Sequence, residues 1–407
     1  MIYAEENPSG VTEVDLVVAI PTFNESANIS AVTSQVDAGL VKYYPDLKSV
    51  IIVCDNHSLD GTREAFLGTD TKNPKIYISS APGERGKGTN LRNLFQKLES
   101  LNPQAVLILE ADVRNVSPDW VYNFIEPVRK GAGYVTPIYV HHKYEATLSS
   151  VIVYPFIRCL YGRRVRQSIA GDCAFGKALV EHFAKTPYWS DFVAEKGIDA
   201  WMVANALYTR QPICQTVIGS PKLHRVKDPH PQVNKAFIQL VGTLFELMTP
   251  FQDFWMKIKW SKPTMLFNAE LREAEVPIPM DVNIARLFET FSRGLDSYRD
   301  LLSQVLSSAE MHKLDEIRSM GIQHFNFPAH TWATILFDVS VAYRNATSND
   351  MKLSLLEALL PLYYGKVASY VRKTERMSTQ QAEEVVESEC MVFEENKAYL
   401  VNRWKTA

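Results

Sequence analysis

The first 112 residues alternate between short apolar runs and amphipathic segments, and this alternation limits the fold more than any other feature. Apolar runs predict buried strands at residues 15–20, 49–54, 75–79 and 105–109. Helical spacing lies between them, most clearly over residues 91–101, where leucines recur on one face. Strands and helices in alternation predict an α/β fold with a mostly parallel sheet and helices on both of its faces.

The second half of the chain follows a helical pattern from about residue 232. Ser378 and Gln381 predict a capping box at the start of one late helix. The length of 407 residues gives a prior of two to three domains. We expect two, an α/β domain over 1–231 and a helical domain over 232–407. The apolar stripes of the helical part predict a core or a homodimer interface.

Composition excludes several classes of protein. The 43 basic and 46 acidic residues leave a formal charge of −3, which gives no general attraction to nucleic acid. Five cysteines lie far apart without a C-x-x-C pair, and the first residues show no signal peptide, so we expect reduced thiols in the cytoplasm. The most apolar runs, 148–160 and 236–248, are too short to cross a bilayer, so we expect no integral membrane association.

Polar motifs follow the predicted strands. They are PTFNE (21–25), CDNHSLDGT (54–62), GERGKG (83–88) and LEAD (109–112). Ligands of parallel sheets bind beyond the carboxyl ends of the strands, which is where these motifs fall. The carboxylates of Glu25 and Asp55 can accept hydrogen bonds from ribose hydroxyls and base N–H groups. This pattern predicts a nucleotide site.

The last two motifs predict how the rest of the nucleotide is held. GERGKG offers backbone N–H groups and Lys87 to a diphosphate, but it lacks the complete P-loop pattern, and no G-x-G-x-x-G follows the first strand. Glu110 and Asp112 are two residues apart at a strand end. Such carboxylates predict a site for Mg²⁺ or Mn²⁺, which would bridge to diphosphate oxygens.

These motifs together resemble the GT-A glycosyltransferases, in a family-2-like form. PTFNE resembles their P-x-x-N-E, DNHSLDGT their D-x-x-S-x-D-G-T, and EAD their metal-binding D-x-D, with Glu110 in place of the first Asp. The resemblance covers about residues 14–230. It implies a Rossmann-like GT-A fold followed by a helical domain. It also implies that the donor is bound by Pro21, Thr22, Asn24, Glu25, Asp55, Asn56, Gly86, Lys87, Glu110, Ala111 and Asp112.

The middle segment resembles one group within that superfamily, the retaining glucosylglycerate, mannosylglycerate and glucosyl-3-phosphoglycerate synthases. The matching features are GKG, IAGD (169–172), GIDAW (197–201) and a later histidine. The resemblance implies that Asp199 lies at the sugar, that Lys87 assists the leaving diphosphate, and that His224 completes a metal site with Asp112 and Glu110. The inverting E-D-x-x-x-x-R-W pattern is absent. We therefore expect retaining, front-face transfer from a UDP- or GDP-hexose.

The acceptor expected from this resemblance is a small anion such as D-glycerate or 3-phosphoglycerate. Arg158, Arg163, Arg164 and Arg166 offer guanidinium groups that suit a carboxylate or phosphate. Arg166 is preferred because it is nearest to IAGD. The expected acceptor residues are Thr136, Arg166, Gly171 and Asp172.

Simpler interpretations and other functions stay open at this point. Asp112 and Asp199 could cap helices, His224 could be an ordinary loop residue, and the arginines could form a solvated helix face. A membrane-associated enzyme acting on a lipid phosphate or polysaccharide is one alternative, and a non-catalytic nucleotide-sugar-binding protein is another. A nucleotide-sugar pyrophosphorylase is disfavoured, because its G-x-G-x-R-x-x-P signature is missing. The donor base and sugar are not determined by the sequence.

Overall fold

A mixed nine-stranded sheet forms in the described part of the chain, with the order β1-β4-β3-β2-β5-β7-β6-β8-β9. The structure is a computed structural model that describes residues 1–223, 229–270, 276–277 and 279–406. The strands are β1 (Ala4–Glu6), β2 (Leu16–Thr22), β3 (Ser49–Asp55), β4 (Lys75–Ser79), β5 (Ala105–Ile108), β6 (Tyr134–Val140), β7 (Cys173–Gly176), β8 (Ile213–Pro221) and β9 (Met265–Phe267).

The strand directions confirm the mostly parallel α/β sheet. β4, β3, β2 and β5 run parallel, as do β6, β8 and β9, whereas β7 is antiparallel to β5 and β6, and β1 to β4. β2 continues two residues beyond its predicted end, through Pro21 to Thr22. β5 pairs with β2 only as far as Ala19, so Pro21 lies where pairing on one side has ended and a missing N–H is tolerated.

Two compact units divide the chain. The sheet unit comprises Met1–Val140, Gln167–Pro229 and Thr264–Val276, and the helical unit comprises the rest. The helices of the sheet unit are α1 (Ile29–Tyr43), α2 (Thr62–Gly68), α3 (Lys87–Leu101), α4 (Pro118–Arg129), α6 (Lys177–Lys185), the π-helix η2 (Val193–Gly197) and α7 (Ile198–Tyr208).

This division differs from a single boundary at residue 231 in two segments. Residues 141–166 belong to the helical unit, because η1 and α5 are buried apolar helices that pack within it. Thr264–Val276 belongs to the sheet unit, because β9 pairs in parallel with β8. Neither of these two segments differs in composition from the residues around it.

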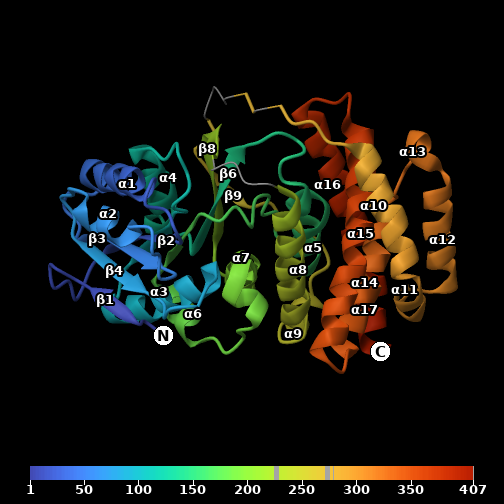
Figure 1. Cartoon of the computed structure of the whole chain (residues 1–407), viewed down its shortest axis with the longest axis horizontal. Helices are drawn as coiled ribbons and strands as arrows, with labels where there is room; N and C mark the ends of the chain where they lie inside the picture. The colour runs from blue at the N-terminus through green and yellow to red at the C-terminus, as the bar shows by residue number, and fades with distance from the viewer. Residues whose placement is uncertain (224–228, 271–275, 278, 407) are drawn as a thin grey trace. The chain divides into compact units, whose positions relative to one another are not determined.

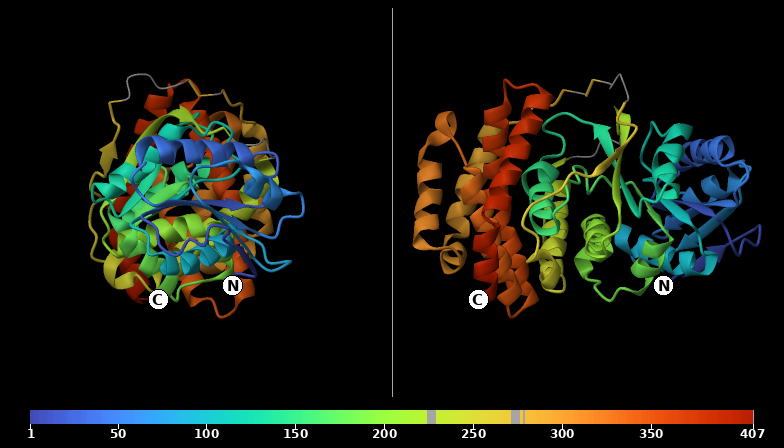
Figure 2. Two further views of the ribbon diagram at one scale, coloured as in Figure 1. Left: turned by 90° about the vertical axis from the view of Figure 1, so that its left-hand side faces the viewer. Right: turned by 180° about the vertical axis from the view of Figure 1, so that it is seen from behind.

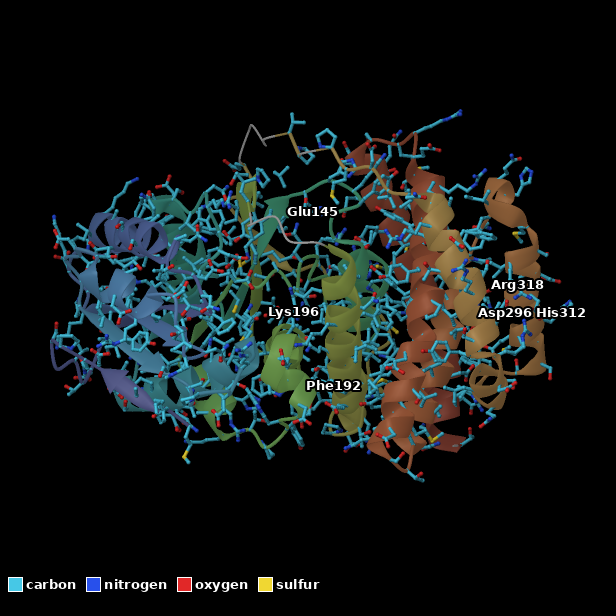
Figure 3. All side chains as sticks on the ribbon, in the orientation of Figure 1. Glu145, Phe192, Lys196, Asp296, His312 and Arg318 are labelled. Carbon is cyan, nitrogen blue, oxygen red and sulfur yellow. The ribbon has the colours of Figure 1, made fainter. Side chains whose placement is uncertain are left out.

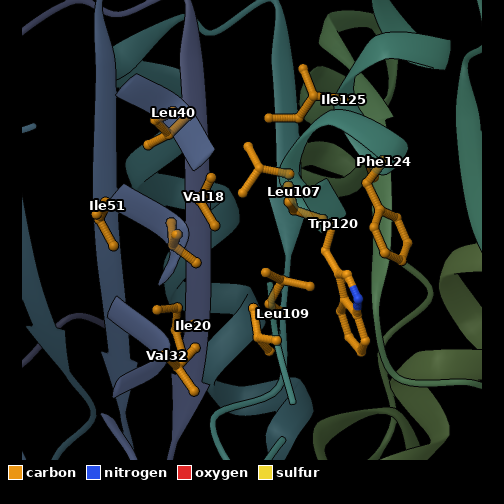
Figure 4. Close-up of a cluster of buried hydrophobic side chains, with 14 of the residues drawn as sticks. Val18, Ile20, Val32, Leu40, Ile51, Leu107, Leu109, Trp120, Phe124 and Ile125 are labelled. Atoms are coloured by element: carbon orange, nitrogen blue, oxygen red, sulfur yellow. The ribbon is translucent and has the colours of Figure 1, made fainter. Parts of the chain in front are cut away.

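Helices cover both faces of the sheet, as the alternation predicts. Figure 1 shows α1 and α4 on one side of β2 and β3, and α3 and α6 on the other. On the first side, Val18 and Ile20 of β2 and Leu107 of β5 pack against Val32 of α1 and Phe124 of α4 (Figure 4). Such burial contributes roughly 1.5–3 kcal/mol for each large apolar side chain.

Aromatic rings fill the opposite side. The Phe183 ring of α6 lies with its centroid 5.1 Å from Phe95 of α3, 5.2 Å from Phe175 of β7 and 5.2 Å from Trp201 of α7. These contacts fix α3 and α7, and those two helices carry Lys87 and Asp199.

The helical unit is built from long helices that approach closely. Its elements are the π-helix η1 (Ser149–Val153), α5 (Tyr154–Tyr161), α8 (Pro229–Met248), α9 (Gln252–Trp255), α10 (Ile284–Ser297), α11 (Arg299–Val305), α12 (Ser308–Ser319), α13 (Gly321–His324), α14 (Ala329–Asn345), α15 (Asn349–Thr374), α16 (Thr379–Glu395) and α17 (Lys397–Thr406). The orange and red helices of this unit lie side by side in the right-hand view of Figure 2.

Particular residues explain this packing. A Cβ at Gly294 of α10 would lie 2.2 Å from the Pro361 ring of α15, so a glycine lets these helices meet. The predicted capping box of Ser378 and Gln381 is confirmed at the start of α16. Ion pairs lie on the surface of this unit, such as that of Arg318 of α12 with Asp296 of α10 (Figure 3). Among the described helices, none combines the length and apolarity needed to cross a bilayer.

Candidate active site

A cavity of about 250 Å³ lies in the sheet unit beside the carboxyl ends of β2, β3 and β5. Its lining contains eight of the eleven residues expected to bind the donor. The lining residues are Pro21, Thr22, Phe23, Glu25, Asn56, Lys87, Asn90, Glu110, Ala111 and Asp112. The other three expected residues, Asn24, Asp55 and Gly86, are not among them. The sheet topology therefore brings the separate motifs to one place.

Asp55 is fully buried and organises the loop that follows β3. Its carboxylate accepts hydrogen bonds from Tyr77 Oη at 2.7 Å, Ser58 N at 2.9 Å, Ser58 Oγ at 2.6 Å and Thr22 Oγ1 at 3.2 Å. Burial, and then the neighbouring Asp55, raise the pKa of Tyr77, so the phenol stays a donor. These bonds fix the Asp55 carboxylate at the end of β3, and its contact with a nucleotide stays a prediction.

Glu25 and Asn56 present polar atoms at the cavity itself. The backbone N–H of Glu25 donates to Thr62 Oγ1 at 2.9 Å, and one carboxylate oxygen accepts from Asn28 Nδ2 at 2.8 Å. Asn56 Nδ2 donates to the Gly86 carbonyl at 3.2 Å. Asn56 Oδ1 is buried and has no hydrogen-bond partner among the described residues. An unsatisfied buried acceptor costs free energy, and a ligand donor would relieve that cost.

The glycine-rich turn brings the start of α3 to the same cavity. Gly86 has a φ of +116° and a Cβ there would lie 2.3 Å from the Ala194 carbonyl oxygen of η2. Only glycine allows this approach without displacement of the backbone. α3 begins directly after it, at Lys87. Its first backbone N–H groups have no partner within the helix and favour an anion such as a phosphate.

Lys87 is held by three acceptors. Its Nζ donates to Glu110 Oε1 at 2.9 Å, Asp199 Oδ1 at 2.8 Å and the Gly171 carbonyl at 3.0 Å. Burial lowers the pKa of Lys87, but the Asp199 and Glu110 carboxylates outweigh burial and raise it above its ordinary value. The ammonium is therefore a permanent charge beside the cavity.

Asp199 lies near the start of α7 with its side chain only 3% exposed. One carboxylate oxygen binds Lys87, and the other, Oδ2, is buried without a hydrogen-bond partner in the described residues. A purely structural ion pair would be expected to satisfy both oxygens. The free oxygen fits a residue that also meets a ligand hydroxyl.

Glu110 is bound by a second lysine that the sequence analysis did not select. Lys222 Nζ donates to Glu110 Oε2 at 2.8 Å, and its side chain is 5% exposed. Burial raises the pKa of Glu110, but Lys222, Lys87 and Lys196 hold it well below its ordinary value. The only signal in the sequence is position, because Lys222 directly follows β8 and begins the KLHRVKD segment.

Gly171 and Asp172 complete this network. A Cβ at Gly171, which has a φ of +90°, would lie 2.4 Å from the Glu110 carboxyl group. Asp172 accepts from Glu110 N at 2.8 Å, Tyr139 Oη at 2.7 Å and Lys222 Nζ at 2.5 Å. Among the expected acceptor residues, these two therefore lie at Glu110. The Thr136 hydroxyl of β6 is buried and has no hydrogen-bond partner in the described residues.

The arginine cluster is engaged elsewhere. Arg166 donates to both Glu383 oxygens, at 2.6 and 2.7 Å, and to Ser150 Oγ at 3.0 Å. Arg158 pairs with Glu394 and Glu387. All of these contacts lie within the helical unit. The guanidinium groups of both arginines form ion pairs with α16, and a role for them in binding the acceptor stays a prediction. Arg163 and Arg164 are exposed.

The described residues contain no group of three or more His, Cys, Asp and Glu side chains that could hold a metal. Of the three expected ligands, Asp112 lines the cavity, Glu110 is bound by two ammonium groups, and His224 lies outside the described residues. One carboxylate at a phosphate site still fits Mg²⁺, which often takes one or two protein carboxylates together with substrate phosphates.

Residues 17–184 match the family model described as glycosyl transferase family 2. These residues form a family-2 glycosyltransferase domain. The resemblance expected from the motifs is confirmed at this level, and the sheet unit has the GT-A fold. The domain carries the cavity and most of the residues described above.

Solved structures similar to the chain include glucosyl-3-phosphoglycerate synthase from Mycobacterium tuberculosis. Its complex with Mn²⁺, UDP and glucosyl-3-phosphoglycerate is 19% identical, covers 59% of this chain and 80% of that one, and has a TM-score of 0.47. Its complex with Mn²⁺, UDP-glucose and phosphoglyceric acid is 20% identical, with the same coverage and a TM-score of 0.46. A structure described as a mycobacterial protein is 17% identical, covers 59% and 75%, and has a TM-score of 0.46. No curated protein matches the chain.

Proposed function

We propose that this glycosyltransferase domain moves a hexose from a UDP- or GDP-sugar to a small anionic acceptor such as D-glycerate or 3-phosphoglycerate, with retention of configuration. The observation that carries the proposal is that Glu25, Asn56, Lys87 and Asp112 all line one cavity at the strand ends. The cavity offers polar acceptors to a nucleoside. It also offers the N-terminus of a helix and an ammonium group to a diphosphate.

A divalent cation, Mg²⁺ or Mn²⁺, would be held by Asp112 and His224 together with the donor diphosphate. When bound, it would supply positive charge against the charge that develops on the leaving nucleoside diphosphate. Lys87 supplies a further positive charge, fixed in advance by Glu110 and Asp199. A charge that is already oriented stabilises a transition state without reorganisation.

Asp199 is proposed to orient the sugar through Oδ2, the carboxylate oxygen that has no protein partner. Its other oxygen is fixed by Lys87 at 2.8 Å, so the carboxylate cannot turn freely. In a front-face reaction the acceptor hydroxyl attacks from the side of the departing phosphate. The phosphate takes the hydroxyl proton, and no covalent enzyme intermediate forms.

The acceptor is proposed to lie at Gly171, Asp172 and the buried Thr136 hydroxyl. The choice of glycerate or phosphoglycerate rests on the motif resemblance, because Arg158 and Arg166 are engaged in ion pairs with glutamates of α16. We further propose that the chain forms a homodimer and that it is located in the cytoplasm.

Transfer assays test this function directly. UDP-glucose, GDP-glucose and GDP-mannose are each combined with D-glycerate or 3-phosphoglycerate and Mn²⁺, and the anomeric configuration of the product is determined by NMR. An α-linked hexosyl product supports the proposal, because the donors are α-linked. An inverted product contradicts retention, and transfer only to a lipid phosphate in vesicles supports the membrane-associated alternative. Nucleotide binding without transfer to any of these acceptors supports a non-catalytic protein.

A further inference from the structure

The sheet unit contains a second cavity, formed by the end of α1, the start of α4, the end of β8 and the segment after β9. Its volume is about 560 Å³, within the range of about 300–1,000 Å³ that is usual for small-molecule sites. None of the described residues that line it also lines the cavity with Lys87 and Asp112. The second cavity is therefore distinct from the candidate active site.

Aromatic rings form part of its wall. Tyr43 of α1 and Tyr122 of α4 line the second cavity with half-buried rings, whose centroids are 4.9 Å apart at an interplanar angle of 36°. The ring of Phe267 of β9 lies 6.0 Å from that of Tyr122. Trp120 (Figure 4) also lines the cavity, and its ring packs on Tyr139 at 5.2 Å. Because neighbouring rings hold these side chains, a ligand meets a fixed apolar surface.

Hydroxyl and amide groups form much of the remaining lining. Ser117 stands at the N-cap of α4, where serine usually caps the helix, but it makes no capping hydrogen bond within the described helix. Asn268 Nδ2 donates to Asn123 Oδ1 at 2.6 Å, which leaves Asn268 Oδ1 as an acceptor and Asn123 Nδ2 as a donor for a ligand. Ser220 of β8 adds a second hydroxyl. Such a mixture of donors and acceptors suits a ligand that carries many hydroxyl groups.

The charges of the lining disfavour an anion. Among the described residues, the lining contains Asp119 and Glu270 but no lysine or arginine. Lys42 Nζ lies 2.9 Å from Asp119 Oδ1, so this carboxylate already has a cationic partner. A nucleotide or a phosphate would therefore be repelled, and the pairing of Asp119 also reduces the attraction for a cation. A neutral ligand fits this balance best.

A sugar combines the chemistry that the aromatic and polar parts of the lining require. One side of a hexose ring presents mostly C–H groups, which pack on an aromatic face, and its rim presents hydroxyls, which donate and accept hydrogen bonds. We propose that the second cavity binds a neutral carbohydrate, such as a short hexose oligosaccharide, separately from the nucleotide-sugar donor. This site goes beyond the proposed transfer reaction and does not depend on it.

Saturation-transfer difference NMR on the full chain tests this site, with glucose, mannose, maltotriose and mannotriose as probes. At least one of these sugars should bind to the unmodified chain without any nucleotide. Tyr122→Ala removes an aromatic face and should weaken binding about tenfold. Tyr122→Phe is the matched control, because it keeps the ring and should bind within about twofold of the unmodified chain.

Two further variants locate the bound sugar. Asn123→Ala removes the amide donor and places a favourable residue in the helix, so it should fold normally and weaken binding about fivefold. This variant keeps the test decisive if Tyr122→Ala does not fold. Lys87→Met alters the other cavity and should leave the affinity for the sugar unchanged.

Several results would overturn the proposal. One is that none of the four sugars binds to the unmodified chain. Another is binding that survives both Tyr122→Ala and Asn123→Ala, or that Lys87→Met abolishes, because the sugar would then lie elsewhere. Choline serves as a cationic probe, and if it binds in place of the sugars and Glu270→Gln removes its binding, the cavity is a cation site. A failure of the transfer assays would leave this proposal standing, because the sugar probes need no donor.

Discussion

Buried lysines in the two units have opposite surroundings. Lys87 of the sheet unit lies between two carboxylates, and although burial lowers its pKa, Asp199 and Glu110 raise it above the ordinary value. Lys397 of the helical unit donates to the carbonyls of Cys159 at 2.7 Å and Leu160 at 3.5 Å, and burial lowers its pKa to about 8. The neighbouring carboxylates keep Lys87 charged, whereas a charge on Lys397 costs free energy of folding.

The ion pairs of the two units differ in whether every carboxylate oxygen has a hydrogen-bond partner. In the helical unit, Arg158 is 2% exposed and its partner Glu394 is 4% exposed, and Ser261 donates its backbone N–H to the same glutamate. In the sheet unit, Asp199 keeps a buried oxygen with no partner among the described residues. A saturated pair stabilises a fold, whereas a pair with spare acceptors beside a cavity can also bind a ligand.

The largest expected effect is at the cavity. Asp112→Asn should lower the transfer rate by about a thousandfold, because it removes the proposed metal ligand and with it several kcal/mol of charge stabilisation. The measurement is the turnover rate with Mn²⁺, and thermal unfolding should be unchanged because Asp112 is not part of the core. A variant that keeps its rate would show that the sheet-unit carboxylates are structural, like those of the helical unit.

The next effect is on stability alone. Arg158→Met should lower the free energy of unfolding by about 3 kcal/mol, since Glu394 becomes an unpaired buried charge. Arg166→Met should lower it by about 1 kcal/mol, because its partner Glu383 is 32% exposed. Denaturant unfolding measures both losses.

The same two arginine variants also test whether the ion pairs of the helical unit affect acceptor binding. Neither should change the KM for the acceptor, and Glu383→Gln should reproduce the stability loss of Arg166→Met. A raised acceptor KM in Arg166→Met, with stability unchanged, would restore the arginine cluster as an acceptor site.

Lys87→Met should lower kcat by about a hundredfold, which is typical of the loss of one oriented group that stabilises transition-state charge. Lys97→Met is the matched control, because Lys97 lies on the same helix, α3, and pairs with Glu5 outside the cavity. Lys97→Met should keep its kcat. Equal losses in both variants would mean that α3 is sensitive to any lysine and that Lys87 has no special role.

The strands and the cavity at their carboxyl ends could be predicted because their signals are local. Each buried strand is a short apolar run, and each motif directly follows a strand, so parallel pairing brings Glu25, Asn56 and Asp112 together. The hydrogen bond between Tyr77 and Asp55 could not be predicted. Tyr77 lies on a neighbouring strand, and the direction of the Asp55 side chain depends on tertiary packing.

The pairing of charges that are distant in the sequence could not be predicted. Arg158 and Glu394 are 236 residues apart, and Arg166 and Glu383 are 217 residues apart. Nothing in the local pattern distinguishes such arginines from those of an anion site. Lys222 was missed for the same reason, since Glu110 lies 112 residues before it. A charge in a sequence shows that a partner is needed, but only the fold shows whether a protein group or a ligand supplies it.

The smallest effect is a pH dependence that belongs to the helical unit. The pKa of Lys397 is about 8 in the folded chain and about 10.4 when unfolded. Below pH 8 both states hold the proton, and the folded state bears the full cost of the buried charge. Between these values the unfolded state binds more protons, so the free energy of unfolding rises with pH. From about pH 8 to 9.5 the unmodified chain should gain about 2 kcal/mol relative to Lys397→Met.

Urea unfolding of both chains across this range measures the difference, in which the titrations of other groups largely cancel. Lys397→Arg is the matched control, because a guanidinium stays protonated throughout and its difference from Lys397→Met should be flat. If the difference between the unmodified chain and Lys397→Met is also flat, Lys397 keeps its proton in the folded state. Lys397 would then be fully charged although its hydrogen-bond partners are carbonyl groups. Lys87 and Lys397 would differ in their partners but not in their protonation.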